Sequence, residues 1–121
     1  MKILGIDDNI DITDLLDTVL NGSDHQYSFV SNGKDGVHLI KQNKYDLILL
    51  DLAMPEFTGL DVIKSLENKG LLEKQKIILF TASALSDNKL NEILNKGIHS
   101  YIRKPVDIDI LLQKIDELEN H

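Results

Sequence analysis

Asp51 ends a run of four apolar residues, 47–50, and so places a carboxylate at the tip of a segment that is expected to be buried. A charge in that position is strongly destabilised unless it reaches solvent, pairs with a cation or binds a metal. Pro55 and Gly59 follow shortly afterwards and favour a turn, where an aspartate is common. Asp51 alone fits a turn and a chemical site equally well, so the other polar residues must decide.

Other apolar runs in the chain also end in polar residues. The adjacent Asp7 and Asp8 and the hydroxyl of Thr81 directly follow such runs, and the ammonium group of Lys104 comes shortly after the mixed segment 98–102. Three carboxylates in one site repel one another, and Lys104 supplies a single positive charge. Mg²⁺ would supply the rest, because it prefers carboxylate, carbonyl and water oxygens. The set contains no His or Cys, which disfavours zinc.

This set of groups predicts phosphoryl chemistry. A carboxylate beside Mg²⁺, flanked by a hydroxyl and a lysine, is suited to attack phosphorus and form an aspartyl phosphate. Mg²⁺ and Lys104 would neutralise charge on the phosphoryl oxygens. Asp51 is the best candidate for the nucleophile because it stands alone, whereas the adjacent Asp7 and Asp8 are better suited to hold the metal.

Short apolar runs alternate with segments of helical periodicity. Strands are expected over residues 3–6, 27–31, 45–51, 76–80 and 98–102. Helices are expected over 12–20, around 37–40, over Gly59–Asn68, around 89–96 and over 108–118. In the first of these helices, one apolar face is predicted from Ile12, Leu15, Leu16, Val19 and Leu20.

The alternation predicts an α/β fold, in which a doubly wound parallel sheet lies between two layers of helices. The first, third and fourth strands are nearly all apolar and should be interior, and the other two should be edges. The carboxyl ends of the strands share one end of such a sheet, where ligands bind. Asp7, Asp8, Asp51, Thr81 and Lys104 should therefore meet there.

Composition narrows the function further. The 121 residues suit a single domain, and no apolar run approaches the length of a membrane span. A net charge of −7, with scattered lysines, argues against binding nucleic acid. The absence of cysteine suits a reducing compartment, and we expect a cytoplasmic protein. The four histidines are scattered and show no metal-binding spacing.

Each residue also has a simpler explanation. Asp7 and Asp8 could begin a helix, Thr81 could lie in a turn, and Lys104 could be an ordinary surface lysine. These explanations fail jointly, because they do not account for five such positions at one end of a sheet.

At these residues the chain resembles the receiver domain of two-component response regulators. The matching segments are IDDN, LILLDLAMPEFTG, LFTAS and YIRKP, and the resemblance covers essentially the whole chain. It implies a flavodoxin-like (βα)5 three-layer sandwich with strand order 2-1-3-4-5. It also implies one receiver domain over residues 1–121, of the stand-alone kind found in chemotaxis regulators, without an output domain.

The resemblance assigns roles around the metal. Asp51 would be the phosphoacceptor, Asp8 would bind Mg²⁺ directly and Asp7 would bind it through water. The backbone carbonyl of Ala53 would be a further ligand, and Mn²⁺ could replace Mg²⁺. Ala53 and Ser83 are small residues at positions that control access of water to the phosphoryl group.

The resemblance also implies a switch. Thr81 and Lys104 would contact phosphoryl oxygens, and the Lys104–Pro105 peptide bond would be cis. On phosphorylation Thr81 would move inward and Tyr101 would follow, although Tyr101 could also be a plain edge-strand aromatic. His38 and Phe57 depart mildly from the family pattern, and neither belongs to the predicted site.

The expected function is a phosphorylation-dependent switch that is not an enzyme toward other substrates. Its partners would be a histidine kinase or histidine phosphotransferase, and a downstream protein bound by the helices near 89–96 and 108–118 with the strand between them. We expect a monomer when the chain is unphosphorylated, and phosphorylation could bring about dimerisation through this face. A phosphorelay intermediate, a phosphate sink and a non-phosphorylated interaction module remain open.

Two other classes fit less well. A phosphatase with an aspartyl-phosphate intermediate would have a second acid where Ala53 stands. A flavodoxin-like nucleotide-binding protein would have a glycine- or hydroxyl-rich phosphate loop in place of the acidic IDDN.

Overall fold

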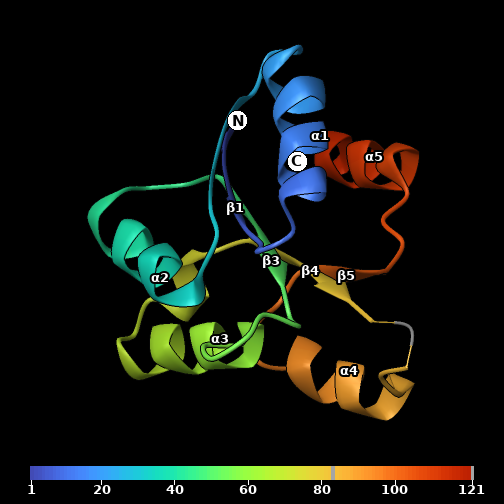
Figure 1. The fold of residues 1–121 in the computed structure, drawn as a ribbon. Coiled ribbons are helices and arrows are strands. Elements are labelled where there is room, and N and C mark those ends of the chain that lie inside the picture. Colours follow the sequence, from blue (N-terminus) through green and yellow to red (C-terminus); the bar gives the residue numbers. More distant parts are fainter. Residues whose placement is uncertain (83, 121) are drawn as a thin grey trace.

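Five parallel strands form one sheet in the computed structural model, which describes residues 1–82 and 84–120 (Figure 1). The order across the sheet is β2-β1-β3-β4-β5, which confirms the predicted fold and strand order. β2 and β5 are the edges, and every residue of β3 and β4 is buried. The strands are β1 (Lys2–Ile6), β2 (Gln26–Val30), β3 (Leu47–Asp51), β4 (Ile77–Thr81) and β5 (Ser100–Arg103).

Helices cover both faces of the sheet (Figure 1). One face carries α1 (Ile10–Asn21) and α5 (Ile108–Glu119), and the other carries α2 (Gly33–Gln42), α3 (Gly59–Asn68) and α4 (Asp87–Leu94). Alternate residues of the central strands feed two apolar clusters, one beneath each helical layer. Because both faces are apolar, the polar side chains of the central strands lie at the strand ends.

The helices begin beside the carboxyl ends of the strands, and a short polar side chain caps each of them. These caps accept hydrogen bonds from backbone N–H groups of the first turn, and they are Asn9, Asn32, Thr58, Ser86 and Asp107. The positive ends of the helix dipoles are therefore directed toward this end of the sheet, where they favour negative charge.

Several element bounds differ from the sequence prediction, and β3, for example, begins at Leu47 rather than at residue 45. β5 begins at Ser100 rather than Ile98, because the backbone N–H of Ile98 bonds to the Leu94 carbonyl at the end of α4 and its side chain is buried in the core. A short 3-10 helix, Leu72–Lys74, precedes β4 and was not predicted.

The buried face of α1 also differs. Leu15, predicted to be apolar core, is 44% exposed, whereas Thr13 is buried. Burial of Thr13 is tolerated because its hydroxyl donates to the Ile10 carbonyl at 3.0 Å. None of the helices in the described part of the chain is long and apolar enough to cross a membrane.

Candidate functional site

The ends of four strands bring the predicted residues together. Asp51 and Thr81 are the last residues of β3 and β4, Asp7 and Asp8 follow β1, and Lys104 follows β5. The pairing of β1 with β3 aligns Ile6 with Leu50, so the chain places Asp7 beside Asp51 although they are far apart in sequence. The sheet topology alone therefore builds the cluster.

Three carboxylates form the centre of the site. Asp7, Asp8 and Asp51 each offer an oxygen within 4.8 Å of the others. Asp7 is 4% exposed and Asp51 is 1% exposed, whereas Asp8 is exposed. Two acids are thus withdrawn from water, and the third opens the cluster to solvent.

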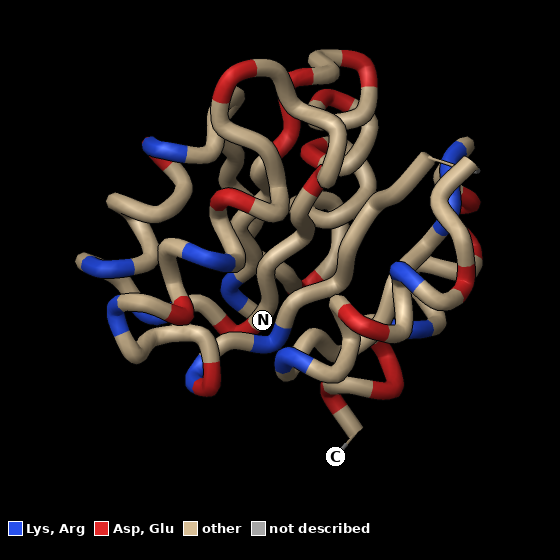
Figure 2. The backbone as a smooth tube through the Cα atoms, turned by 90° about the horizontal axis from the view of Figure 1, so that it is seen from below, with Lys and Arg blue, Asp and Glu red and all other residues tan. Residues whose placement is uncertain are grey.

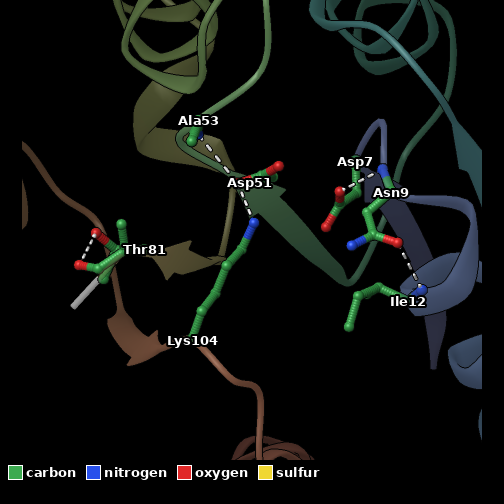
Figure 3. Close-up of polar contacts among 8 residues, drawn as sticks. Asp7, Asn9, Ile12, Asp51, Ala53, Thr81 and Lys104 are labelled. Carbon is green, nitrogen blue, oxygen red and sulfur yellow. Dashed lines mark hydrogen bonds and ion pairs between the residues drawn. The ribbon is translucent and has the colours of Figure 1, made fainter.

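Asp51 is held by two hydrogen bonds to the same carboxylate oxygen (Figure 3). The ammonium group of Lys104 lies 2.9 Å from Asp51 Oδ1, and the backbone N–H of Ala53 donates to that oxygen at 3.0 Å. The ion pair is partly buried, because the Lys104 side chain is 30% exposed. Lys104 therefore fixes the orientation of Asp51 and offsets part of the negative charge.

Asp7 is held less completely. Its Oδ1 accepts the backbone N–H of Asn9 at 2.9 Å, while its buried Oδ2 has no hydrogen-bond partner. Burial and the charge of Asp51 together raise the pKa of Asp7 to about 6, against the opposing effects of the Asn9 N–H and Lys104. The cluster therefore holds more negative charge than its protein partners balance.

These residues fit Mg²⁺. The donors are all oxygens, two are fixed on neighbouring strand ends, and the orphaned Oδ2 of Asp7 lacks a positively charged or N–H partner. The cluster includes no His or Cys, so its chemistry favours a hard divalent cation over zinc. A divalent cation would balance the charge that Lys104 leaves.

Thr81 ends β4, the strand next to β3 and Asp51, whereas Tyr101 lies on the edge strand β5 opposite Leu79. Thr81 is 1% exposed, and its hydroxyl donates to the carbonyl of Ala82 at 3.4 Å, on the side away from Asp51 (Figure 3). Tyr101 is half-buried, and the guanidinium of Arg103 lies 5.6 Å from its ring centre. Ser83 lies outside the described residues.

The Lys104–Pro105 peptide bond, which the resemblance implies to be cis, is cis in the structure.

Sequence reasoning did not single out two residues, of which Asn9 supports the site and Arg103 links β5 to the start of α4. Asn9 orients Asp7 through its backbone and caps α1 through its side chain, which accepts N–H groups of the first turn at 3.0 and 3.4 Å. Its place directly before a helical pattern is a cap signal that could have identified it. Arg103 donates to the carbonyl of Leu85 at 2.8 Å and to Asp87 at 2.7 Å, and no local signal reveals contacts between such distant segments.

Comparisons with known proteins agree with this geometry. The family model of the response regulator receiver domain matches residues 3–116. The transcriptional regulatory protein DltR of Streptococcus agalactiae is 33% identical over 115 residues, which are 95% of this chain and 50% of DltR. The chain thus spans about half the length of this curated relative.

Solved structures show the same fold. The receiver domain of the Francisella response regulator 1452 has a TM-score of 0.85 at 29% identity, covering 97% of this chain and 94% of that one. TrrA from Thermotoga maritima, solved in complex with Mg²⁺-BeF, has a TM-score of 0.78 at 27% identity, covering 97% of both chains.

Proposed function

This chain belongs to the response regulator receiver domain family, and we propose that it accepts a phosphoryl group on Asp51 from a phosphohistidine of a partner protein. Receiver domains work with histidine kinases in two-component systems, so the donor is a histidine kinase or a histidine phosphotransferase. The observation that carries the proposal is the environment of Asp51. This buried carboxylate lies against Lys104 and beside two further acids at a strand end.

The two oxygens of Asp51 have different roles in this proposal. Oδ1 accepts hydrogen bonds from Lys104 and Ala53, so Oδ2 is the oxygen that attacks phosphorus. As the O–P bond forms, the P–N bond of the phosphoimidazole breaks and its electron pair stays on nitrogen, so the protonated donor leaves as neutral histidine. Lys104 is near enough to neutralise charge on a transferred phosphoryl oxygen.

The acids would hold the metal. Asp8 and Asp51 would bind Mg²⁺ directly, Asp7 through water and Ala53 through its backbone carbonyl, with Mn²⁺ as a substitute. When bound, the cation would offset the negative charge of the cluster and of the incoming phosphoryl group. TrrA, which is similar in structure, was solved with Mg²⁺-BeF, and this supports the assignment.

The output would be a change of surface. The Thr81 hydroxyl would leave the Ala82 carbonyl for a phosphoryl oxygen, and Tyr101 would turn inward. Because Arg103 contacts Tyr101, Leu85 and Asp87, this movement would shift the surface formed by α4, β5 and α5 between two populations. A downstream protein would bind one of these two forms of the surface.

Intact-mass measurement after incubation with acetyl phosphate and Mg²⁺ tests the proposal. The wild-type chain should gain one phosphoryl group, and Asp51→Asn and a sample with EDTA should gain none. Asp46→Asn is the matched control, because Asp46 is an exposed aspartate at the other end of the same strand. If the wild-type chain gains no mass under any condition, the phosphoacceptor role is wrong and a non-phosphorylated interaction module is favoured.

A further inference from the structure

The phenol ring of Tyr27 fills the space above Gly5, which is free because glycine has no side chain. It lies on β2 opposite Ile3 of β1, and its phenol ring reaches along β1 to Gly5. A Cβ atom at Gly5 would overlap the Tyr27 hydroxyl and would lie 2.9 Å from the ring carbon that bears it. Any larger residue at position 5 would therefore displace the phenol.

The hydroxyl of Tyr27 is directed toward the acidic cluster. Side chains of a strand alternate between faces, so Ile3, Gly5 and Asp7 share one face of β1. The alternation continues to Asp7, because its backbone N–H bonds to the Val30 carbonyl at 3.1 Å and extends the pairing of β1 with β2. The Tyr27 hydroxyl lies above Gly5, and Asp7 is the next residue of the chain that has its side chain on this same face.

Tyr27 and Asp7 also share an unusual feature. Tyr27 is 7% exposed and Asp7 is 4% exposed. In the described part of the chain, the Tyr27 hydroxyl and Asp7 Oδ2 are the two buried side-chain polar atoms without a hydrogen-bond partner. One is a donor and the other an acceptor, and buried polar groups are rarely left unpaired. Burial raises the pKa of Tyr27, and the charge of Asp7 raises it further, which is consistent with their proximity.

We propose that Tyr27 is a positioning residue of the metal site, whose hydroxyl donates a hydrogen bond to one enclosed water that in turn donates to Asp7 Oδ2. This inference rests on the proposed function, because Asp7 matters here as a holder of Mg²⁺. Groups that hydrogen-bond to the direct ligands of a metal fix their orientation, and their loss typically weakens metal binding by about 10- to 100-fold. Asp7 would hold Mg²⁺ through water, so the loss of its partner should fall at or below the lower end of this range. Gly5 is then the residue that makes room for this donor.

Tyr27→Phe tests the role directly, because it removes the hydroxyl and keeps the ring. Mg²⁺ affinity would be measured from amide chemical shifts during a Mg²⁺ titration, and the melting temperature without Mg²⁺ would be recorded in parallel. We expect Tyr27→Phe to weaken Mg²⁺ binding by up to about tenfold. Tyr45→Phe is the matched control, a buried tyrosine before β3 at the other end of the sheet, and its Mg²⁺ affinity should be unchanged.

Two further variants separate positioning from packing. Gly5→Ala keeps the hydroxyl but fills its place, and it should also weaken Mg²⁺ binding. In an Asp7→Asn background, Tyr27→Phe should have no further effect on Mg²⁺ affinity, because Tyr27 acts through Asp7.

The opposite results would overturn the inference. If Tyr27→Phe binds Mg²⁺ like the wild type and melts at a higher temperature, the hydroxyl is simply an unpaired group whose removal stabilises the fold. That outcome, with normal phosphorylation of the wild type, overturns the positioning role alone. Failure of the wild-type chain to bind Mg²⁺ at all overturns both this inference and the proposed function.

Discussion

The two ends of the sheet differ in how far their charged side chains are buried. At the carboxyl end, Asp7 and Asp51 are buried, and one oxygen of Asp7 has no partner. At the amino end, charged side chains that include Lys44, Asp46, Lys74 and Lys76 are exposed. Several of them surround a cavity of about 440 Å³ beside the N-terminus, and Figure 2 shows lysine segments near that terminus.

The comparison shows what distinguishes a site from a charged surface. Exposed charges remain hydrated and contribute little to stability, whichever sign they carry. Buried charges cost free energy unless they are fully paired. At the carboxyl end, Lys104 pairs with Asp51 and the backbone N–H of Asn9 bonds to Asp7, and these contacts offset only part of that cost. Matched substitutions at the two ends should therefore give very different results.

The largest difference is expected for lysines. Lys104→Ala should slow phosphorylation of Asp51 by acetyl phosphate at least about 100-fold, because it removes the cation that would neutralise the transferred oxygens. Lys76→Ala, an exposed lysine directly before β4, should leave the rate unchanged. The initial rate of mass gain measures both, and equal rates for the two variants would contradict the difference between the ends.

The next difference concerns stability and its dependence on pH. The folded pKa of Asp7 is raised to about 6 from 3.8, so the native state binds more protons than the unfolded state between these values. The contribution of the protonated Asp7 to the free energy of unfolding is therefore fully present below about pH 4 and is lost as the pH rises through about 6. Asp7→Asn should raise the free energy of unfolding at pH 7.5 by up to about 3 kcal/mol and flatten this dependence.

Urea unfolding at several pH values checks that prediction. The matched variant Asp46→Asn removes an exposed carboxylate and should keep the pH dependence of the wild type. A loss of stability in Asp7→Asn at pH 7.5 would mean that the buried charge is better balanced than the contacts indicate.

Mg²⁺ should stabilise the folded chain, because it would balance the buried negative charge at the carboxyl end of the sheet. At a tenfold excess over its dissociation constant, a cation bound only by the folded state stabilises it by about 1.4 kcal/mol. Thermal unfolding with Mg²⁺, with EDTA and with NaCl at equal ionic strength would measure this gain. Asp51→Asn should lose most of it, and a gain that survives in Asp51→Asn would place the metal elsewhere.

The smallest effects belong to the amino end. Lys44→Gln and Lys74→Gln should change the free energy of unfolding by no more than about 0.5 kcal/mol, since both side chains are solvated. Chemical denaturation is sensitive enough to detect a larger value, which would reveal an interaction at this end that exposure alone does not suggest.

Sequence predicts the parts of this molecule that depend on local pattern. The apolar runs before Asp51 and Thr81 indicate interior strands, and parallel topology then places their ends together. Sequence does not predict the direction of the Thr81 hydroxyl, which turns to its neighbour Ala82. Nor does it predict the contact of Tyr27 with Gly5, because the pairing of β1 with β2 and the free space above a glycine exist only in the folded sheet.

Met1 and Glu119, near the two ends of the described chain, both contact His25. The amino group of Met1 lies 3.2 Å from one nitrogen of His25, whose other nitrogen lies 3.1 Å from Glu119. A short linker could join these ends, and new termini could be opened in the nearby turn at residues 43–46. Such a circular permutant, or a reporter inserted at that turn, would leave the acidic cluster at the opposite end intact and would carry the proposed phosphorylation site into other proteins.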